Sequence, residues 1–417
     1  MALGRGRGWA LALAATFTMA VSYLDRQTLA VLAPTVTKEL RIGEQAYGWL
    51  VSAFSFAYLA GPPFAGRWLD RVGARRGLFV SVALWSAVAA GHSLVTGFSM
   101  LFAMRIALGL AESPSFPGAA QIVQRGLPPE ERPRAFGILF TGSSFGAMVA
   151  PPLATWLAAH FGWRGAFIGT ALVGLSWVPL WLFLTRGDEA RRALDRAPDD
   201  VVAAPTRGDW LTLLRDPAVL RAAALVLAVA PFSGVLFNWG AKFLVRHHGL
   251  TQAEVGHYLW IPPLFFDLGS IAFGHFASRR AGLLRDGSPA RALLGVSALV
   301  SLALFAMPFA PTPLTAMLVA GVSLIGGGGM FAILSSDMLA RVPGRLVSSA
   351  SGLTAATQSL AYIIANPLVG KSVDATQSFT PALLVLTAWI VPGALVWLLW
   401  TPRPPENFTQ RSQSSGR

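Results

Sequence analysis

Apolar stretches of about 20 residues recur along nearly the whole chain and are separated by short polar breaks. A helix needs roughly 20 mainly apolar residues to cross the hydrocarbon core of a bilayer. The pattern therefore predicts an all-α membrane protein of about twelve transmembrane helices. Their expected ranges are 9–32, 46–66, 77–96, 98–123, 134–158, 163–185, 219–246, 253–278, 290–309, 312–338, 346–371 and 378–401.

The longest polar stretch lies near the middle of the chain, between Thr185 and Pro217. It has mixed charge, contains Pro198 and Pro205 and shows no sustained apolar periodicity, which is typical of a linker. We therefore expect a six-helix bundle over 1–185, a cytoplasmic linker over 186–217, a second six-helix bundle over 218–402 and a cytoplasmic tail over 403–417.

The two expected halves carry similar polar loops, which indicates an internal repeat. Gly66–Arg76, after the second expected helix, has a weaker echo in Gly274–Arg280 after the eighth. Likewise, Glu131–Gly137 before the fifth helix corresponds to Gly344–Gly352 before the eleventh. Two related halves with a binding site at their interface near the bilayer midplane form an architecture for transport by alternating access.

Composition agrees with this pattern, because 54% hydrophobic and 13% charged residues do not describe the surface of a soluble globular protein. Cysteine is absent, and the six histidines are scattered without the spacing of metal ligands. We therefore expect no disulfide, no metal and no cofactor. The expected driving force is a proton gradient, which would act through carboxyls inside the membrane.

Basic residues predict the orientation in the membrane. Of the 33 Lys and Arg residues, 25 lie in the two termini and in the loops on their side of the membrane. By the positive-inside rule both termini are cytoplasmic in a multi-pass protein of the bacterial inner membrane. The net charge of +13 lies in loops that flank the membrane, which favours anionic lipid rather than nucleic acid as the partner.

Six charged residues lie well inside the expected helices, away from the helix ends. A charge at the centre of a bilayer costs at least about 2.5–3.5 kcal/mol, so these side chains are expected to face a cavity or a partner. Arg105 and Glu112 are seven residues apart, which returns to nearly the same helix face after two turns. The six are Asp25, Arg26, Arg105, Glu112, Lys242 and Asp267.

The arginines and carboxyls suggest anion binding coupled to protons. The planar guanidinium holds a carboxylate through two parallel hydrogen bonds, so Arg26 or Arg105 is the expected anion clamp. A buried carboxyl binds a proton more readily, and a neighbouring arginine opposes this. Occupancy of the arginine by substrate could thus switch Asp25 or Glu112 between its two protonation states. Alternatively, Asp25 and Arg26 form a locked pair, and Glu112 caps its helix near a kink.

Lys242 and Asp267 are the charged residues well inside the helices of the second half, and they are a possible polar pair. Two alternatives stay open. Lys242 could extend to the outer membrane interface near His247 and His248, as long basic side chains do at helix ends. Asp267 could contact a substrate hydroxyl instead.

Uncharged polar residues could complete a site for a hydroxyl-rich substrate, which needs directional donors, acceptors and aromatic edges. The candidates are Tyr23, Gln27, Tyr58, Asn238, Gln358 and Asn366. A separate charged set is expected at the cytoplasmic helix ends, where ion pairs could form when that face closes and separate when it opens. The residues of this expected gate are Asp70, Arg71, Arg75, Arg76, Arg132 and Arg134.

The loop Gly66–Arg76 resembles a pattern of Gly, Asp, Arg, Gly and basic residues found in the major facilitator superfamily. A narrower similarity is to its anion:cation symporter family, within it to bacterial hexuronate and sugar-acid transporters of the galactonate, glucuronate and galacturonate type. This similarity is close over roughly 20–185 and looser in the second half. It rests on Tyr23–Gln27, Arg105–Pro117, Gly142–Gly146 with Pro151 and Pro152, Phe161–Arg164, 262–267 and 336–338.

The resemblance implies the major facilitator fold, with two pseudo-symmetric six-helix halves, and proton-coupled symport of a small organic anion. It implies that Asp25, Arg26, Arg105 and Glu112 match the family's binding and coupling residues. Typical members carry Asn-Trp-Pro in helix 4 and a Lys four residues beyond that Pro. Here these places read Ser115–Pro117 and Gln121, so a smaller or more aromatic monocarboxylate is an alternative to a hexuronate, and the sequence leaves both open.

Other functions on the same fold remain open. A proton-driven exporter would need no carboxylate on its substrate, and an organic-anion exchanger would move no net protons. An enzyme is not expected, because the sequence has no catalytic constellation. We expect the transporter to function as a monomer.

Overall fold

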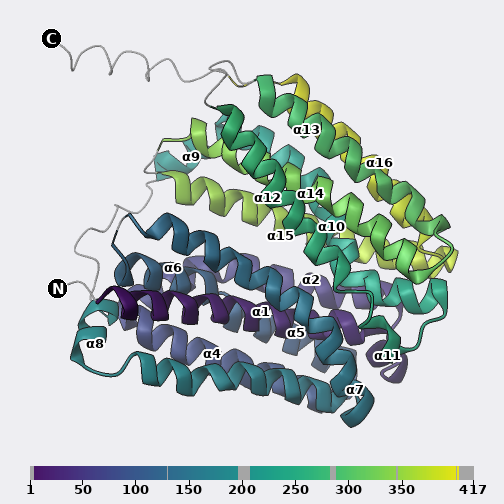
Figure 1. Ribbon diagram of the computed structural model, residues 1–417. Coiled ribbons are helices and arrows are strands. Elements are labelled where there is room, and N and C mark those ends of the chain that lie inside the picture. The colour runs from purple at the N-terminus through teal and green to yellow at the C-terminus, as the bar shows by residue number, and fades with distance from the viewer. Residues whose placement is uncertain are drawn as a thin grey trace.

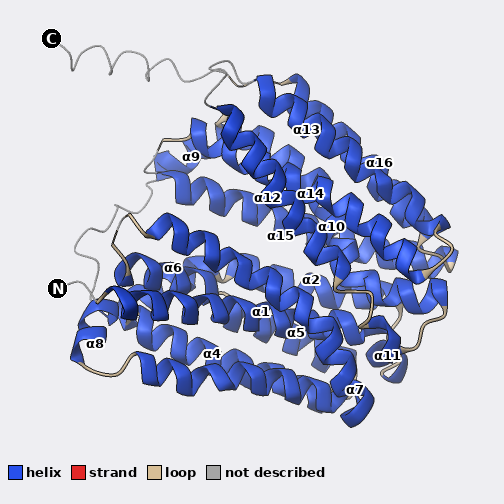
Figure 2. Cartoon of the chain, viewed as in Figure 1, coloured by secondary structure: helices blue, strands red, loops and turns tan. Residues whose placement is uncertain are grey.

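The computed structural model describes residues 4–128, 130–195, 207–281, 288–343, 346–400 and 402. In these ranges the regular elements are helices (Figure 2). The expected tail over 403–417 and residues 196–206 of the expected linker lie outside the described residues.

The first half contains α1 (Arg5–Glu39), α2 (Glu44–Ala60), α3 (Pro62–Val72), α4 (Ala74–Gly91), η1 (His92–Leu94), α5 (Phe98–Glu112), α6 (Ser115–Gly126) and α7 (Arg132–Leu184). At 1.5 Å per residue, the 53 residues of α7 would be more than twice as long as a bilayer core is thick. The helix changes direction at Gly162, whose φ of 69° is accessible mainly to glycine. It therefore supplies two crossings.

The second half contains α10 (Pro217–His248), α11 (Gln252–Val255), α12 (Ile261–Ala281), α13 (Ser288–Ser301), η2 (Leu302–Phe309), α14 (Pro313–Arg341), α15 (Val347–Thr376) and α16 (Thr380–Leu399). The long helix that was expected over 253–278 begins later in the structure, at Ile261 of α12. The first residues of the expected range form the separate α11, in which Glu254 accepts hydrogen bonds from the backbone and hydroxyl of Thr251. These bonds lower the pKa of Glu254.

Six helical stretches of the described chain are long and apolar enough to cross a membrane by length and composition alone. One of them, 134–184, is the double crossing of α7. The remaining expected crossings do not meet this criterion, because charges or breaks interrupt their apolar stretches. For example, α1 carries Asp25 and Arg26, and α5 is separated from α6 at Ser113 and Pro114.

The expected linker is not simply extended. It forms α8 (Asp188–Asp195) and α9 (Arg207–Arg215) on either side of residues that lie outside the description. Ala190 and Leu194 of α8 are buried, and Asp195 forms an ion pair of 2.8 Å with Arg75. The helix α8 is therefore fastened to the first half.

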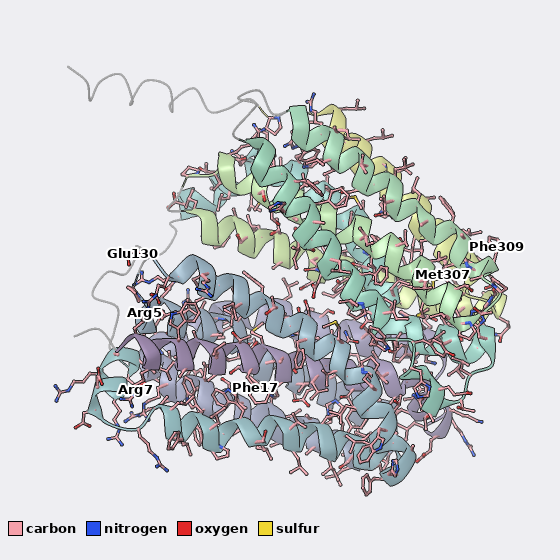
Figure 3. The ribbon with its side chains drawn as sticks, viewed as in Figure 1. Arg5, Arg7, Phe17, Glu130, Met307 and Phe309 are labelled. Atoms are coloured by element: carbon pink, nitrogen blue, oxygen red, sulfur yellow. The ribbon has the colours of Figure 1, made fainter. Side chains whose placement is uncertain are left out.

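The helices form two bundles, α1–α8 and α9–α16, which lie one above the other in Figure 1. We call the end where α1 begins and α16 ends the terminal end. The opposite end, where α1 and α15 end and α2 begins, is called the closed end. Figure 3 shows Arg5 and Arg7 at the terminal end, and Met307 and Phe309 at the opposite one.

Candidate functional site

A buried ion pair joins α1 to α5 in the middle of the first half. Nη2 of Arg26 lies 3.1 Å from Oε2 of Glu112. The same carboxylate oxygen accepts a hydrogen bond of 2.8 Å from Oγ of Ser22. The Glu112 side chain is fully buried, whereas 19% of the Arg26 side chain is exposed. Glu112 is therefore a partner of α1 and not a local helix cap, and Arg26 pairs with Glu112 and not with Asp25.

Three aromatic rings surround the guanidinium of Arg26. Its Cζ lies 4.6 Å from each ring centroid of Tyr23, Phe54 and Tyr58. The rings of Phe54 and Tyr58, one turn apart on α2, are stacked at 5.8 Å. Cation–π contacts stabilise a cation in a desolvated place by about 0.5–2 kcal/mol each. The structure thus brings together three of the expected binding residues, Tyr23, Arg26 and Tyr58.

Arg105 is buried beside the same ring. Its Cζ lies 4.7 Å from the centroid of Phe54, and only 4% of the residue is exposed. Nε and Nη1 are buried and have no hydrogen-bond acceptor among the residues that the structure describes. Glu112 and Tyr47 are within electrostatic range. A guanidinium so placed is costly to bury without acceptors, so the surroundings suit the binding of an anion.

Asp25 faces a different environment from Arg26, because neighbouring residues on a helix point about 100° apart. It is 3% exposed, and neither carboxylate oxygen has a hydrogen-bond donor among the described residues. A Cβ added to Gly174 on α7 would lie 3.6 Å from Oδ2 of Asp25 and 2.5 Å from Oγ of Ser86 on α4. Asp25 therefore points into the interior of the first half, among α1, α4 and α7.

The amides of the second half are held by protein hydrogen bonds. Nδ2 of Asn366 donates to the carbonyl oxygen of Tyr362 over 2.8 Å, and Oδ1 accepts from Nε1 of Trp239 over 2.9 Å. Nε2 of Gln358 donates over 3.0 Å to the hydroxyl of Tyr362. Asn366 is buried at 2% exposure, so it stabilises the packing of α10 against α15. Gln358 is half-buried.

Asn238 lies near the boundary between the halves. Nδ2 of Asn238 donates over 2.8 Å to the backbone carbonyl of Gly234, and the backbone carbonyl of Asn238 accepts a 2.6 Å hydrogen bond from the hydroxyl of Tyr47. The latter bond links α10 to α2. Tyr362 lies within electrostatic range of Tyr23 and Arg26, so α15 approaches the rings of the first half. Gln27, next to Arg26 on α1, is half-buried.

The expected pair between Lys242 and Asp267 is wrong. Nζ of Lys242 lies 2.6 Å from Oε2 of Glu44, and Nη1 of Arg246 lies 3.3 Å from Oε1 of the same residue. Lys242 is 5% exposed and lies near the last turns of α10, close to Arg246. Asp267 instead accepts a 2.7 Å hydrogen bond from Oγ of Ser144 on α7. Each of the two charges thus has its partner in the first half.

Glu44 was missed by sequence reasoning, and it belongs to a set of contacts that join the halves at the closed end. Oδ1 and Oδ2 of Asp374 accept hydrogen bonds of 3.1 and 2.9 Å from the backbone N–H groups of Glu44 and Gln45. A carboxylate at a helix N-terminus is favourable, because the helix dipole is positive there. Further in, a Cβ on Gly48 would clash with the carbonyl oxygen of Asn366, so only glycine permits this approach of α2 to α15.

At the terminal end, the residues of the expected gate make contacts within their own half. Oδ1 of Asp70 accepts a 2.8 Å hydrogen bond from Gln121, and Arg75 pairs with Asp195. Arg71 and Arg76 are exposed. Nε of Arg132 donates to the carbonyl of Leu127 over 3.0 Å, and Arg134 lies over the ring of Trp9. The gate itself stays a prediction, since it concerns another conformation.

The sequence matches the model of the Major Facilitator Superfamily over residues 15–366. A hexuronate transporter of Escherichia coli strain K12 is 28% identical over 98% of both chains. A D-galactonate transporter of Escherichia coli O6:H1 is 25% identical over 92% of this chain and 93% of its own. A galacturonate transporter of Dickeya chrysanthemi is 28% identical over 65% of this chain and 81% of its own.

Solved structures agree on the fold. A bacterial homolog of the human lysosomal transporter Spinster, in an inward-facing and unoccupied conformation, superposes with a TM-score of 0.77 at 17% identity, covering 96% of this chain and all of that chain. A mutant form of the nucleoside transporter NupG gives 0.72 at 15% identity over 93% of this chain and 99% of its own. The chain is thus a multi-pass membrane transporter and not an enzyme, and it belongs to the major facilitator superfamily.

Proposed function

We propose that the chain is a secondary active transporter that carries a small organic anion, a sugar acid or another monocarboxylate, together with protons by alternating access. The carrying observation is a pair of guanidiniums beside the ring of Phe54. That of Arg26 has a carboxylate partner, and that of Arg105 is buried with no acceptor for Nε or Nη1 among the described residues. Relatives named as transporters of hexuronate, galacturonate and galactonate support an anionic substrate.

The substrate carboxylate binds to the arginines. Arg105 offers donors without acceptors, and Arg26 becomes available when its hydrogen bond to Glu112 is broken. Arginine suits this role because it stays charged and can bind a carboxylate with two parallel hydrogen bonds. Tyr23, Gln27 and Tyr58 would contact the rest of the substrate, while Asn238, Gln358 and Asn366 shape the opposite wall.

Proton coupling follows from exchange of partners. When the substrate takes Arg26, Glu112 loses its cation while it remains buried, and protonation removes the cost of that isolated charge. Asp25, buried and without donors among the described residues, is the second carboxyl that can bind a proton. Release of the substrate restores the pair between Arg26 and Glu112 and expels the proton. Anion and proton therefore move together.

The orientation combines the charge bias with the contacts between the halves. Basic residues gather on the side of the termini, which is cytoplasmic by the positive-inside rule in the inner membrane. The closed end then faces outward. The proposed site is formed by the two halves of one chain, which supports function as a monomer.

Uptake into proteoliposomes tests the proposal. Purified protein is first screened by thermal shift against sugar acids and simple carboxylates, because a ligand stabilises the protein that it binds. The best ligand is then labelled and supplied with a pH gradient, acidic outside. We expect accumulation above the equilibrium level that a protonophore abolishes. Accumulation that is indifferent to the gradient would point to an exchanger, and proton-driven efflux of uncharged compounds would point to an exporter.

A further inference from the structure

A second charged cavity lies at the closed end, apart from the buried arginines. It has a volume of about 340 Å³ and is lined by Pro34, Lys38, Ile42 and Glu44 of the first half and by Lys242 and Arg246 of the second, among others. We call it the outer vestibule. Its volume falls at the lower end of the range of small-molecule sites, about 300–1,000 Å³.

The outer vestibule has more cations than its one carboxylate can neutralise. Glu44 gives one oxygen to Lys242 at 2.6 Å and the other to Arg246 at 3.3 Å, so both of its oxygens are occupied. Lys38 lines the same cavity without an ion pair within 4.0 Å among the described residues. The lining thus has three cations and one carboxylate, and the carboxylate of Asp374, outside the lining, also lies within electrostatic range of Lys242. A small anion would lower the mutual repulsion of these cations without displacing Glu44.

The walls of the outer vestibule come from both halves, and this determines what a bound anion does. Lys38 and Glu44 belong to α1 and α2, whereas Lys242 and Arg246 belong to α10. When the halves separate at this end, the two groups of cations move apart and the cavity is lost. A ligand shifts a conformational equilibrium toward the state to which it binds more tightly. An anion in the outer vestibule must therefore favour closure of this end.

We propose that the outer vestibule is a regulatory binding site for a small carboxylate, separate from the transport site, and that its occupation holds the closed end shut. This proposal rests on the proposed function only in taking a carboxylate as the ligand. By reciprocity, closure of this end raises the affinity of the site for the anion. At high external concentration, the carboxylate would therefore slow the return of the empty carrier to its outward-open state.

Spin-label distances across the closed end test this proposal. The chain contains no cysteine, so cysteines introduced at the exposed His160 on α7 and Ala375 on α15 can be labelled specifically. Sodium glucuronate and sodium benzoate are titrated in turn, with glucose as the uncharged control. We expect each carboxylate to increase the population with the short distance. Simple screening by salt would weaken the Glu44 pairs and shift the distances the other way.

Two variants separate the outer vestibule from the transport site. Lys38→Gln removes a vestibule cation without touching a partner of Glu44, and Lys371→Gln removes an exposed lysine of α15 outside the lining described above. Because Lys38 is exposed, its removal should have a modest effect. We expect the carboxylate concentration that gives half of the distance shift to rise about threefold to fivefold in Lys38→Gln and to stay unchanged in Lys371→Gln.

If the distance shift of Lys38→Gln responds to carboxylate as that of the parent does, the effect belongs to the transport site. That result would overturn the vestibule proposal and leave the proposed function intact. Opening of this end by both carboxylates, or no shift with either, would also overturn it. The proposed function fails by a different result, namely the absence of gradient-driven uptake in proteoliposomes.

Discussion

The two halves have the same helical architecture but differ in what they bury at the centre. The first half buries Asp25, Arg105 and Glu112 and holds Arg26 among aromatic rings. The second half buries Asn366 and places its cations Arg221 and Lys242 toward its two ends, each paired with a carboxylate. Under the proposed function, the first half recognises the charge of the substrate, and the second half supplies neutral amides.

The largest expected effect contrasts one carboxyl from each half. Asp25→Asn removes a buried carboxyl that has no donor among the described residues, so we expect proton-driven accumulation to be abolished while counterflow exchange remains measurable. Asp267→Asn is the matched control, because an amide can still accept the hydrogen bond from Ser144. Uptake of labelled substrate into proteoliposomes with and without a pH gradient measures both. Unchanged uphill uptake by Asp25→Asn would remove it from coupling.

Arg105→Lys is expected to have the next largest effect. Lysine keeps the charge but loses the planar set of donors, so carboxylate affinity should fall about tenfold to a hundredfold, the equivalent of roughly 1.4–2.8 kcal/mol. Isothermal titration or thermal shift with carboxylates and a neutral analogue measures this. The neutral analogue should bind almost as before. If carboxylates bind to the variant as tightly as to the parent, Arg26 must be the clamp.

Much of the fold could be predicted from the sequence, because lipid requires long apolar helices and leaves a strong periodic signal. The ends of elements were less predictable. The start of α11 is set by a capping box between Thr251 and Glu254, and Pro262 and Pro263 suit the first turn of a helix, as at the start of α12. The double length of α7 was resolved correctly into two crossings, because a turn was expected near Gly162.

The site could be predicted as a list of residues but not as a set of partners. Intramembrane charges stand out in a sequence, so Arg26 and Glu112 were both identified. Their pairing joins residues 86 positions apart, and no local spacing encodes that. Glu44 escaped because it lies at the start of a helix, where an acidic residue is ordinary. The signal that could have found it is topology, since α2 begins at the end where α10, with Lys242, finishes.

A smaller effect tests where the two halves meet. Glu44 and Lys242 form a largely buried pair, so Glu44→Gln and Lys242→Met should each destabilise the closed end, and the double variant should be less damaged than their sum. We expect a coupling free energy of about 1–3 kcal/mol from a double-mutant cycle on thermal or chemical unfolding. The same cycle on Lys242 and Asp267 should be additive within about 0.5 kcal/mol. Strong coupling there would contradict the partners assigned above.

The smallest expected effect concerns the amide wall of the second half. Gln358→Ala removes a neutral, half-buried hydrogen bond to Tyr362, which contributes about 0.5–1.5 kcal/mol at most. Affinity for benzoate should therefore change by less than about threefold, because its carboxylate is held by the arginines of the first half. The affinity of Gln358→Ala for glucuronate decides whether the second half also contacts the substrate. If its affinity falls much further than that of benzoate, Gln358 contacts substrate hydroxyls and the second half selects sugar acids. If both affinities stay within threefold, the amides serve only packing, and selection of the substrate lies among the rings around Arg26.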